Sequence, residues 1–118
     1  MAPDRKLLII DDEEDLCFLL KDYFTKKNYD VYVCHTLEDG ERTLQSVNPA
    51  IVFLDNNLPD GTGWTAAPQI AMSFPATELV LLSAFHPEVP AMPSGARFHL
   101  IEKPVSLADL DSKFAGIF

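Results

Sequence analysis

The chain has 118 residues, a length that fits one compact domain, and its hydrophobic content of 47% supports a buried core and argues against intrinsic disorder. Its 18 acidic and 9 basic side chains give a formal net charge of −9, and a surface of this sign repels nucleic-acid phosphates and anionic lipid. We therefore expect a single domain, residues 1–118, that binds neither nucleic acid nor membrane directly.

The cysteines and the N-terminal region indicate a cytoplasmic chain. Cys17 and Cys34 lie in apolar stretches and are too few for a disulfide framework, so we expect reduced, buried thiols. The first apolar run, residues 7–10, is followed at once by acidic residues. It is too short for a signal sequence or a membrane span.

The first predicted strand is residues 7–10, and a helix follows it. A second, weaker strand is predicted at residues 31–34. After it we expect a shorter helix with Thr36 as its N-cap and Asp39 three residues further on. The apolar positions of the first helix have helical spacing and are Leu16, Leu19, Leu20, Tyr23 and Phe24.

The middle of the chain continues this alternation. Residues 51–54 are an apolar run typical of a buried strand, and a third helix is expected within residues 62–74. Pro68 lies inside that segment, so the helix either begins late, with the proline in its first turn, or is kinked. Residues 79–82 predict the fourth strand.

The segment before the last predicted strand departs from the pattern. Residues 86–95 contain three prolines, which lack the backbone N–H that a helix interior needs, so a regular helix is not expected there. The fifth strand is predicted at residues 98–101. A final helix begins at Ser106, which with Asp109 resembles a capping box in which aspartate replaces the usual glutamate.

Strands that alternate with helices predict an α/β fold whose parallel sheet is covered on both faces. Five such units in this length predict the flavodoxin-like (βα)5 three-layer sandwich, a parallel five-stranded sheet in the order 2-1-3-4-5. The proline-rich segment predicts that its fourth helix is irregular or missing.

The residues at the predicted strand ends suggest the chemistry. In such a sheet functional groups gather at the carboxyl ends of the strands. There the sequence places Asp11 and Asp12, then Asp55, Ser83 and Lys103. Three carboxylates in one cleft resist joint ionisation, and Mg²⁺, which takes oxygen ligands, would remove that conflict. Asp55 could then act as a nucleophile that forms an aspartyl phosphate, while Ser83 and Lys103 contact phosphate oxygens.

Four segments together resemble the signature of response regulator receiver domains, the CheY-like superfamily of two-component signal transduction. They occur in the family's order with similar spacing, and the resemblance spans nearly the whole chain. The segments are LIIDDE at 8–13, VFLDNNLPDG at 52–61, LLSA at 81–84 and IEKP at 101–104.

This resemblance implies a Mg²⁺ cofactor and names its ligands. Asp12 would bind the ion directly and Asp11 through water, while Asp55 and the backbone carbonyl of Asn57 would complete the protein ligands. The next acidic residue, Glu13, is interpreted with Glu14 and Asp15 as a surface residue that complements the helix dipole. The Asn57 side chain would face the attacking water during dephosphorylation.

The resemblance also implies a phosphorelay function. Asp55 would accept a phosphoryl group from a histidine kinase or a histidine phosphotransferase, Lys103 would pair with it, and Ser83 would move toward it as the switch hydroxyl. The bond between Lys103 and Pro104 is expected to be cis. Such a domain phosphorylates and dephosphorylates itself, is not a turnover enzyme, and switches contacts with a downstream protein or effector domain. It would be a monomer or a weak homodimer.

Two features depart from the family pattern. Leu100 stands where the family usually carries tyrosine or phenylalanine, and the nearest aromatic residue, Phe98, is on the same strand face. The missing fourth helix belongs to the usual output surface. We expect the phosphorylation chemistry to survive while the output is unconventional.

The remaining candidates have plainer interpretations. His35, His86 and His99 lack metal-ligand spacing and are treated as structural or surface residues, although His86, three residues after Ser83, could modulate it. Trp64 is expected to pack at the start of the third helix. Ser83 could also be an ordinary strand-end hydroxyl, and Lys103 a solvated lysine.

Two other functions remain open. One is a degenerate receiver that acts as a phosphorylation-independent interaction module, which Leu100 and the proline-rich segment favour and the complete acid set opposes. The other is a phosphohydrolase of the haloacid-dehalogenase kind. That family requires a second aspartate two residues after the nucleophile, and this chain has Asn57 there.

Overall fold

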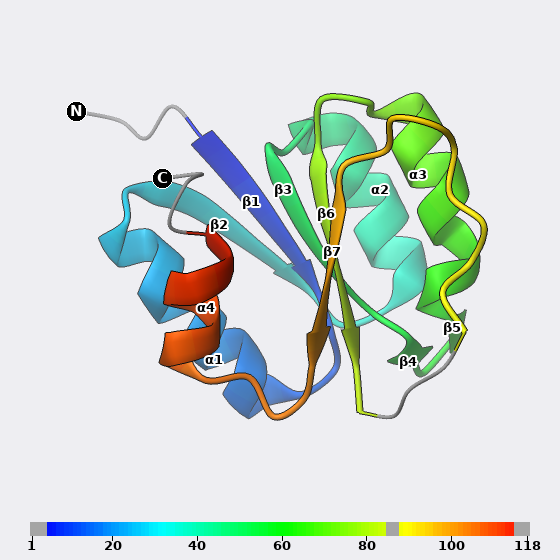
Figure 1. Ribbon diagram of the computed structural model, residues 1–118. Helices are drawn as coiled ribbons and strands as arrows, with labels where there is room; N and C mark the ends of the chain where they lie inside the picture. Colours follow the sequence, from blue (N-terminus) through cyan, green and yellow to red (C-terminus); the bar gives the residue numbers. More distant parts are fainter. Residues whose placement is uncertain (1–4, 85–87, 115–118) are drawn as a thin grey trace.

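A five-stranded parallel sheet forms the middle layer of the computed structural model, which describes residues 5–84 and 88–114 (Figure 1). Its order is β2-β1-β3-β6-β7, which is the predicted order 2-1-3-4-5 once the two short strands β4 and β5 outside the sheet are set aside. The flavodoxin-like fold is thus confirmed. The strands are β1 (Arg5–Ile10), β2 (Tyr29–Cys34), β3 (Ile51–Asp55), β6 (Glu78–Ser83) and β7 (Phe98–Glu102).

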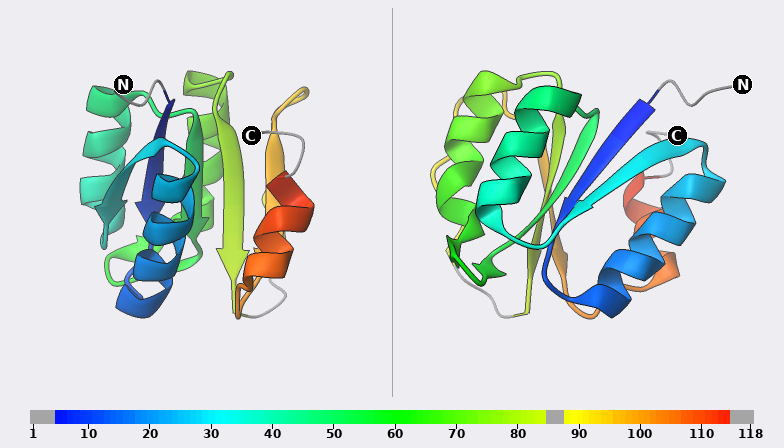
Figure 2. Two further views of the ribbon diagram at one scale, coloured as in Figure 1. Left: turned by 90° about the vertical axis from the view of Figure 1, so that its left-hand side faces the viewer. Right: turned by 180° about the vertical axis from the view of Figure 1, so that it is seen from behind.

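Helices cover both faces of this sheet, as Figures 1 and 2 show. On one face lie α1 (Glu14–Lys26) and α4 (Leu107–Phe114), and on the other lie α2 (Leu37–Val47) and α3 (Ala67–Ser73). Within the described ranges no helix has both the length and the apolar character that a membrane span needs.

The two faces of the sheet bury separate hydrophobic clusters, because successive side chains of a strand point to opposite sides. Leu7 and Ile9 of β1 pack with α1 and α4, whereas Leu8 and Ile10 pack with α2 and α3. All four are fully buried. The first cluster is rich in aromatic rings, among them Phe24, Phe53 and Phe114.

Local signals in the sequence set the helix boundaries as predicted. The Thr36 hydroxyl accepts a hydrogen bond from the Asp39 amide at 3.2 Å and caps α2. Ser106 and Asp109 form the expected reciprocal capping box, with bonds of 3.1 and 3.2 Å. Pro68 lies in the first turn of α3, which follows the short 3-10 helix η1 (Gly63–Ala66), so the late-start alternative is confirmed.

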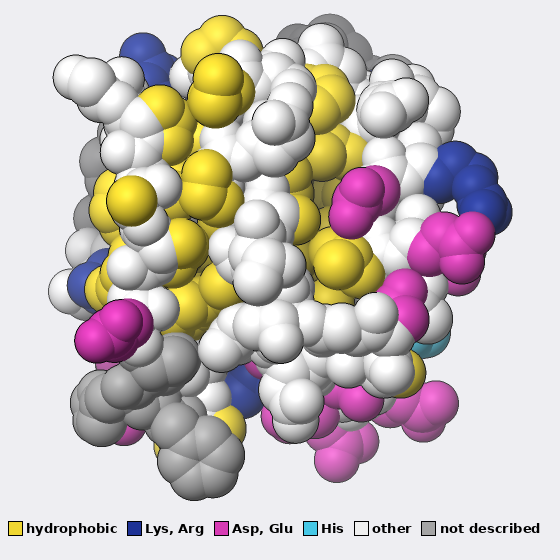
Figure 3. Space-filling model, turned by 90° about the vertical axis from the view of Figure 1, so that its right-hand side faces the viewer, with side chains coloured by type: hydrophobic (Ala, Val, Ile, Leu, Met, Phe, Trp, Pro, Cys, Tyr) yellow, Lys and Arg dark blue, Asp and Glu magenta, His cyan; other side chains and the backbone are white. Residues whose placement is uncertain are grey.

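The chain between β6 and β7 has no helix within its described part, residues 88–97. The fourth helix of the (βα)5 pattern is therefore absent there, as the prolines predicted. Leu100 of β7, an edge strand of the sheet, is 42% exposed. The face of the molecule that lies on the right-hand side of Figure 1 exposes hydrophobic side chains over a broad area (Figure 3). His86 lies outside the described residues.

Candidate functional site

The carboxylates of Asp11, Asp12 and Asp55 meet at one end of the sheet. Asp11 and Asp12 follow β1, Asp55 ends β3, and the two strands are parallel neighbours. One carboxylate oxygen from each residue lies within 4.8 Å of the other two. Asp11 is fully buried and Asp55 is 3% exposed, whereas Asp12 is exposed to solvent. The predicted convergence of these three residues is confirmed.

A tight hairpin follows Asp55 and fixes its backbone. It consists of the two-residue strands β4 (Asn57–Leu58) and β5 (Gly61–Thr62). Its base is closed by the Gly63 amide, which donates to the Asn56 carbonyl at 3.0 Å. A Cβ on Gly63 would lie 2.0 Å from the carbonyl oxygen of Asp55, so only glycine fits there.

Trp64 packs beneath this hairpin at the start of η1, as predicted. It is 5% exposed, and its indole N–H donates to the Leu54 carbonyl at 3.2 Å. A buried indole with a satisfied N–H is a rigid support. It therefore holds the end of β3 against the helical layer below the Asp55 carboxylate.

Lys103 reaches the acids from the end of β7. Its Nζ atom lies 2.7 Å from Glu13 Oε1, 2.9 Å from Asp11 Oδ2 and 3.4 Å from Asp55 Oδ1. Its backbone amide donates to the Ser83 carbonyl at 2.7 Å, and its side chain is only 10% exposed. The peptide bond to Pro104 is cis, as expected. Lys103 is thus a partly buried member of the site and not a solvated surface lysine.

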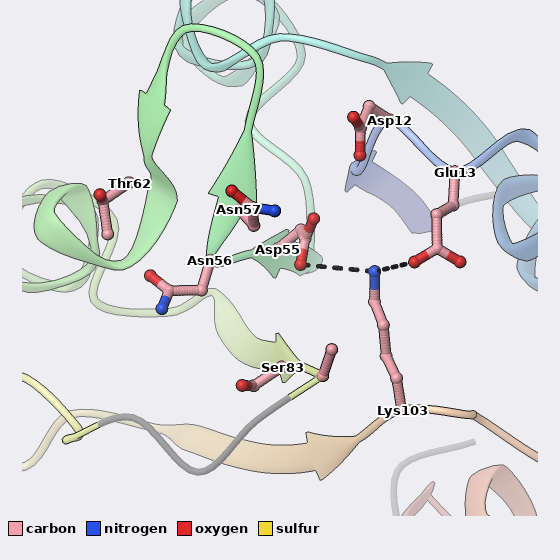
Figure 4. A pocket seen from close by; sticks show the side chains of 9 residues that line it. Asp12, Glu13, Asp55, Asn56, Asn57, Thr62, Ser83 and Lys103 are labelled. Atoms are coloured by element: carbon pink, nitrogen blue, oxygen red, sulfur yellow. Dashed lines mark hydrogen bonds and ion pairs between the residues drawn. The ribbon is translucent and has the colours of Figure 1, made fainter.

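These groups surround an open pocket of about 390 Å³ (Figure 4). Ser83, at the end of β6, lines the pocket together with side chains from the three other strand ends. Asp11 is buried below its floor. The residues that line it are Asp12, Glu13, Asp55, Asn56, Asn57, Thr62, Ser83, Ala84 and Lys103.

The electrostatics of the site are those of crowded, poorly solvated acids. Burial, reinforced by the charge of Asp11, raises the pKa of Asp55 to about 6. Burial also raises the pKa of Asp11. Burial alone would lower the pKa of Lys103, but its bonds to Glu13 and Asp11 outweigh this and raise the pKa above the ordinary value of lysine. The ammonium therefore stays charged, and it neutralises only part of the negative charge around it.

The donor set fits Mg²⁺. The Oδ2 atom of Asp11 is buried and accepts no hydrogen bond of regular geometry among the described residues, and Lys103 Nζ is the cation beside it. Carboxylate oxygens from Asp12 and Asp55 lie close enough to share one ion with Asp11. Mg²⁺ is commonly held in this way, by carboxylates and water.

Three contacts of the site lie outside the sequence prediction. Glu13, interpreted as a dipole-complementing surface residue, is exposed at the N-terminus of α1 and in addition pairs with Lys103 (Figure 4). His35 Nδ1 lies 3.0 Å from the Asp11 carbonyl, which also accepts a hydrogen bond from the Cys17 thiol at 3.2 Å. Because all three contacts join residues far apart in the chain or on different elements, no local pattern in the sequence could have indicated them.

The other singled-out side chains lie away from the pocket or have structural partners. His99 pairs with Glu78 on the neighbouring strand at 3.2 Å, in keeping with a structural role. Both cysteines are free thiols, but Cys34 is only partly buried, whereas Cys17 is buried as expected. Burial of Cys17 raises the pKa of its thiol to about 12, so it stays protonated at neutral pH.

The comparisons with known proteins agree with this geometry. The family model of the response regulator receiver domain matches residues 7–115. The chain is 34% identical over 117 residues to the sensory transduction protein BceR of Bacillus subtilis (strain 168), a match that covers 96% of this chain and 49% of BceR. It is 26% identical over 113 residues to the photosynthetic apparatus regulatory protein RegA of Rhodobacter capsulatus, covering 93% of this chain and 61% of RegA. The chain thus spans about half of one relative and about three fifths of the other.

Solved structures share the fold over almost the whole chain. A two-component response regulator from Clostridium difficile has a TM-score of 0.82 and 26% identity, with 97% of this chain and 95% of that chain covered. A chain in the complex of the histidine kinase ThkA with the response regulator protein TrrA has a TM-score of 0.75 and 24% identity, with 94% and 96% covered. At that identity the second likeness shows the fold alone.

Proposed function

The chain belongs to the response regulator receiver domain family, and from this premise we propose that it is a phospho-acceptor receiver in a two-component phosphorelay. Asp55 is the proposed acceptor. The observation that carries the proposal is the meeting of three carboxylates and a largely buried lysine side chain at one open pocket. We further propose that residues 1–118 form this one receiver domain.

The proposed reaction moves a phosphoryl group from a phosphohistidine nitrogen to a carboxylate oxygen of Asp55. As the new P–O bond forms, the P–N bond breaks, and the released imidazole nitrogen takes a proton. The product is an aspartyl phosphate, and hydrolysis of its P–O bond returns the carboxylate and inorganic phosphate. Because the pKa of Asp55 is about 6, the carboxylate is ionised and nucleophilic at neutral pH.

Other residues of the pocket stabilise the charge of the transferred group. The Lys103 ammonium, 3.4 Å from Asp55 Oδ1, is placed to pair with a phosphoryl oxygen. Ser83 lines the same pocket and offers a hydroxyl donor. Asp11, Asp12, Asp55 and the backbone carbonyl of Asn57 are the proposed ligands of Mg²⁺. When bound, the ion would offset the negative charge that gathers on the phosphoryl oxygens.

We propose a histidine kinase or a histidine phosphotransferase as the donor. A neighbour of the same fold is described as the partner of a histidine kinase, which supports a protein donor of that kind. Phosphorylation adds negative charge at a single point and biases nearby loops toward a second conformation. The downstream partner would then bind the surface near Ser83 and residues 88–97, the described segment that stands in place of the fourth helix.

The test is chemical labelling of the acceptor. Acetyl phosphate with MgCl2 should add one phosphoryl group to the wild-type chain, and tandem mass spectrometry should place it on Asp55. The adduct should be absent in Asp55→Asn and unaffected in Glu14→Gln, an exposed acid at the start of α1 that lies outside the pocket. Wild-type protein that stays unlabelled would instead support a phosphorylation-independent interaction module.

A further inference from the structure

Asp60, at the tip of the β4–β5 hairpin, is bonded to a helix 23 residues earlier in the chain. Its Oδ1 accepts the Leu37 amide at 2.7 Å and its Oδ2 accepts the Glu38 amide at 2.9 Å. Both amides belong to the first turn of α2, where backbone N–H groups have no partner within the helix. The helix thus has two separate caps, Thr36 on the Asp39 amide and Asp60 on the two amides before it.

The hairpin that carries Asp60 is the same one that carries Asn57. Asn57 pairs with Thr62 in the two-residue strands, between the hairpin's base and its tip. The base is fixed by the bond from Gly63 to Asn56, and the buried side chain of Leu58 packs into the core below. The tip has one polar attachment to α2 through Asp60. Without it, the bond at the base and the packing of Leu58 would remain, but the tip would no longer be held on α2.

The helix at the other end of this attachment is itself packed closely on β1. Gly40, one turn into α2, lies so near the strand that a Cβ there would be 2.5 Å from Ile10 Cδ1. Ile10 is the last residue of β1, directly before Asp11 and Asp12. Asp60 therefore connects the hairpin after β3, through α2, to the strand end that carries the acidic pair.

We propose that Asp60 is a positioning residue for the acceptor site, a clip that holds the hairpin on α2 and so fixes the Asn57 carbonyl relative to the carboxylates that follow β1. This inference rests on the proposed function, since the geometry that it preserves is that of the Mg²⁺ ligands. Groups that orient metal ligands without touching the ion are commonly worth about 10-fold or more in affinity. The amides of Leu37 and Glu38 lower the pKa of Asp60, so its carboxylate is ionised at neutral pH.

The experiment compares Mg²⁺ affinity across matched cap variants. MgCl2 alone is titrated into the full chain by calorimetry, with the fluorescence of Trp64, the only tryptophan, as a second readout. Asp60→Ala removes both acceptors and should weaken Mg²⁺ binding by about 10-fold. Asp60→Asn keeps the turn-forming side chain and one acceptor oxygen, so it should weaken binding less, by about 2- to 3-fold.

The matched control is Thr36→Ala, which removes the other cap of the same helix but leaves the hairpin attached. It should lower the urea midpoint to an extent comparable with Asp60→Ala, yet change Mg²⁺ affinity by less than about 2-fold. If both variants weaken Mg²⁺ binding equally, Asp60 acts only through helix stability and the positioning role is wrong. If wild-type protein itself binds no Mg²⁺ and forms no Asp55 adduct, the proposed function is what fails.

A second measurement uses the reciprocity of coupled equilibria. If the hydrogen bonds that Asp60 accepts strengthen Mg²⁺ binding, bound Mg²⁺ must stabilise those hydrogen bonds by the same factor. Amide hydrogen exchange at Leu37 and Glu38 should therefore slow when MgCl2 is added, while exchange at Asp39, which Thr36 caps, should change much less. Exchange at Leu37 and Glu38 that is insensitive to bound Mg²⁺ would contradict the coupling.

Discussion

At the scale of the residue, Asp55 combines burial with a carboxylate that ionises near neutral pH. It is 3% exposed and lies beside Asp11, so the same desolvation that raises its pKa to about 6 also makes its charge costly. Lys103 offsets part of this cost from 3.4 Å away, while also bonding Glu13 and Asp11. A site arranged in this way is under electrostatic strain until another cation enters it.

This strain predicts a pH-dependent stability in Mg²⁺-free protein. An unfolded aspartate titrates near 3.8 and folded Asp55 near 6, so between these values the folded state binds more protons. The free energy of unfolding should therefore fall as the pH rises through this window, by on the order of 3 kcal/mol. Asp55→Asn should be more stable than wild type at neutral pH and equal to it near pH 4. Urea unfolding in EDTA measures both, and parallel pH profiles would refute the prediction.

Single residues at strand ends were predictable because a parallel sheet brings its carboxyl ends together whatever else the chain does. Asp11, Asp12, Asp55 and Lys103 follow from that rule. The hydrogen bond that Lys103 donates to Glu13 does not, since it joins residues 90 positions apart on different elements. The distance between these two side chains depends on the backbone path of two loops. Residue types and their spacing in the sequence do not determine that path.

At the scale of the element, the position of α2 depends on a single glycine. Gly40 faces Ile10 at a distance that leaves no room for a methyl group. Gly40→Ala should therefore destabilise the fold by about 1–3 kcal/mol despite the better helix propensity of alanine. The cost should shrink in an Ile10→Ala background, where space is available. A double-mutant cycle by urea unfolding measures this coupling, and additive effects would show that the two residues do not limit the packing.

Elements with a strong local pattern were predicted, and those set by tertiary contacts were not. The five strands and the caps at Thr36 and Ser106 follow from apolar runs and capping residues. The absence of a helix from residues 88–97 follows from the prolines of that segment. The β4–β5 hairpin has strands of two residues each, too short to produce any periodicity. It forms because Gly63 closes its base and Asp60 attaches its tip to α2.

At the scale of the whole molecule, the candidate site joins the sheet to the layer of helices on either side of it. Asp11 and Asp12 lead from β1 into α1, Asp55 leads from β3 toward α3, and Lys103 leads from β7 toward α4. The chain also carries a net charge of −9, so cations gather around it without binding at a defined site. Bound Mg²⁺ should stabilise the entire fold, and this effect has to be separated from general screening.

We expect MgCl2 at 100 times its dissociation constant to raise the free energy of unfolding by about 2.7 kcal/mol, because the ion binds only the folded state. Urea unfolding at constant ionic strength, with NaCl replacing MgCl2, measures the gain. Asp12→Asn should lose most of it, since Asp12 supplies one of the three clustered carboxylates. Glu14→Gln, which removes one negative charge outside the pocket, should keep it. An equal gain in both variants would mean that Mg²⁺ acts by screening, and that the three strand-end carboxylates do not hold an ion.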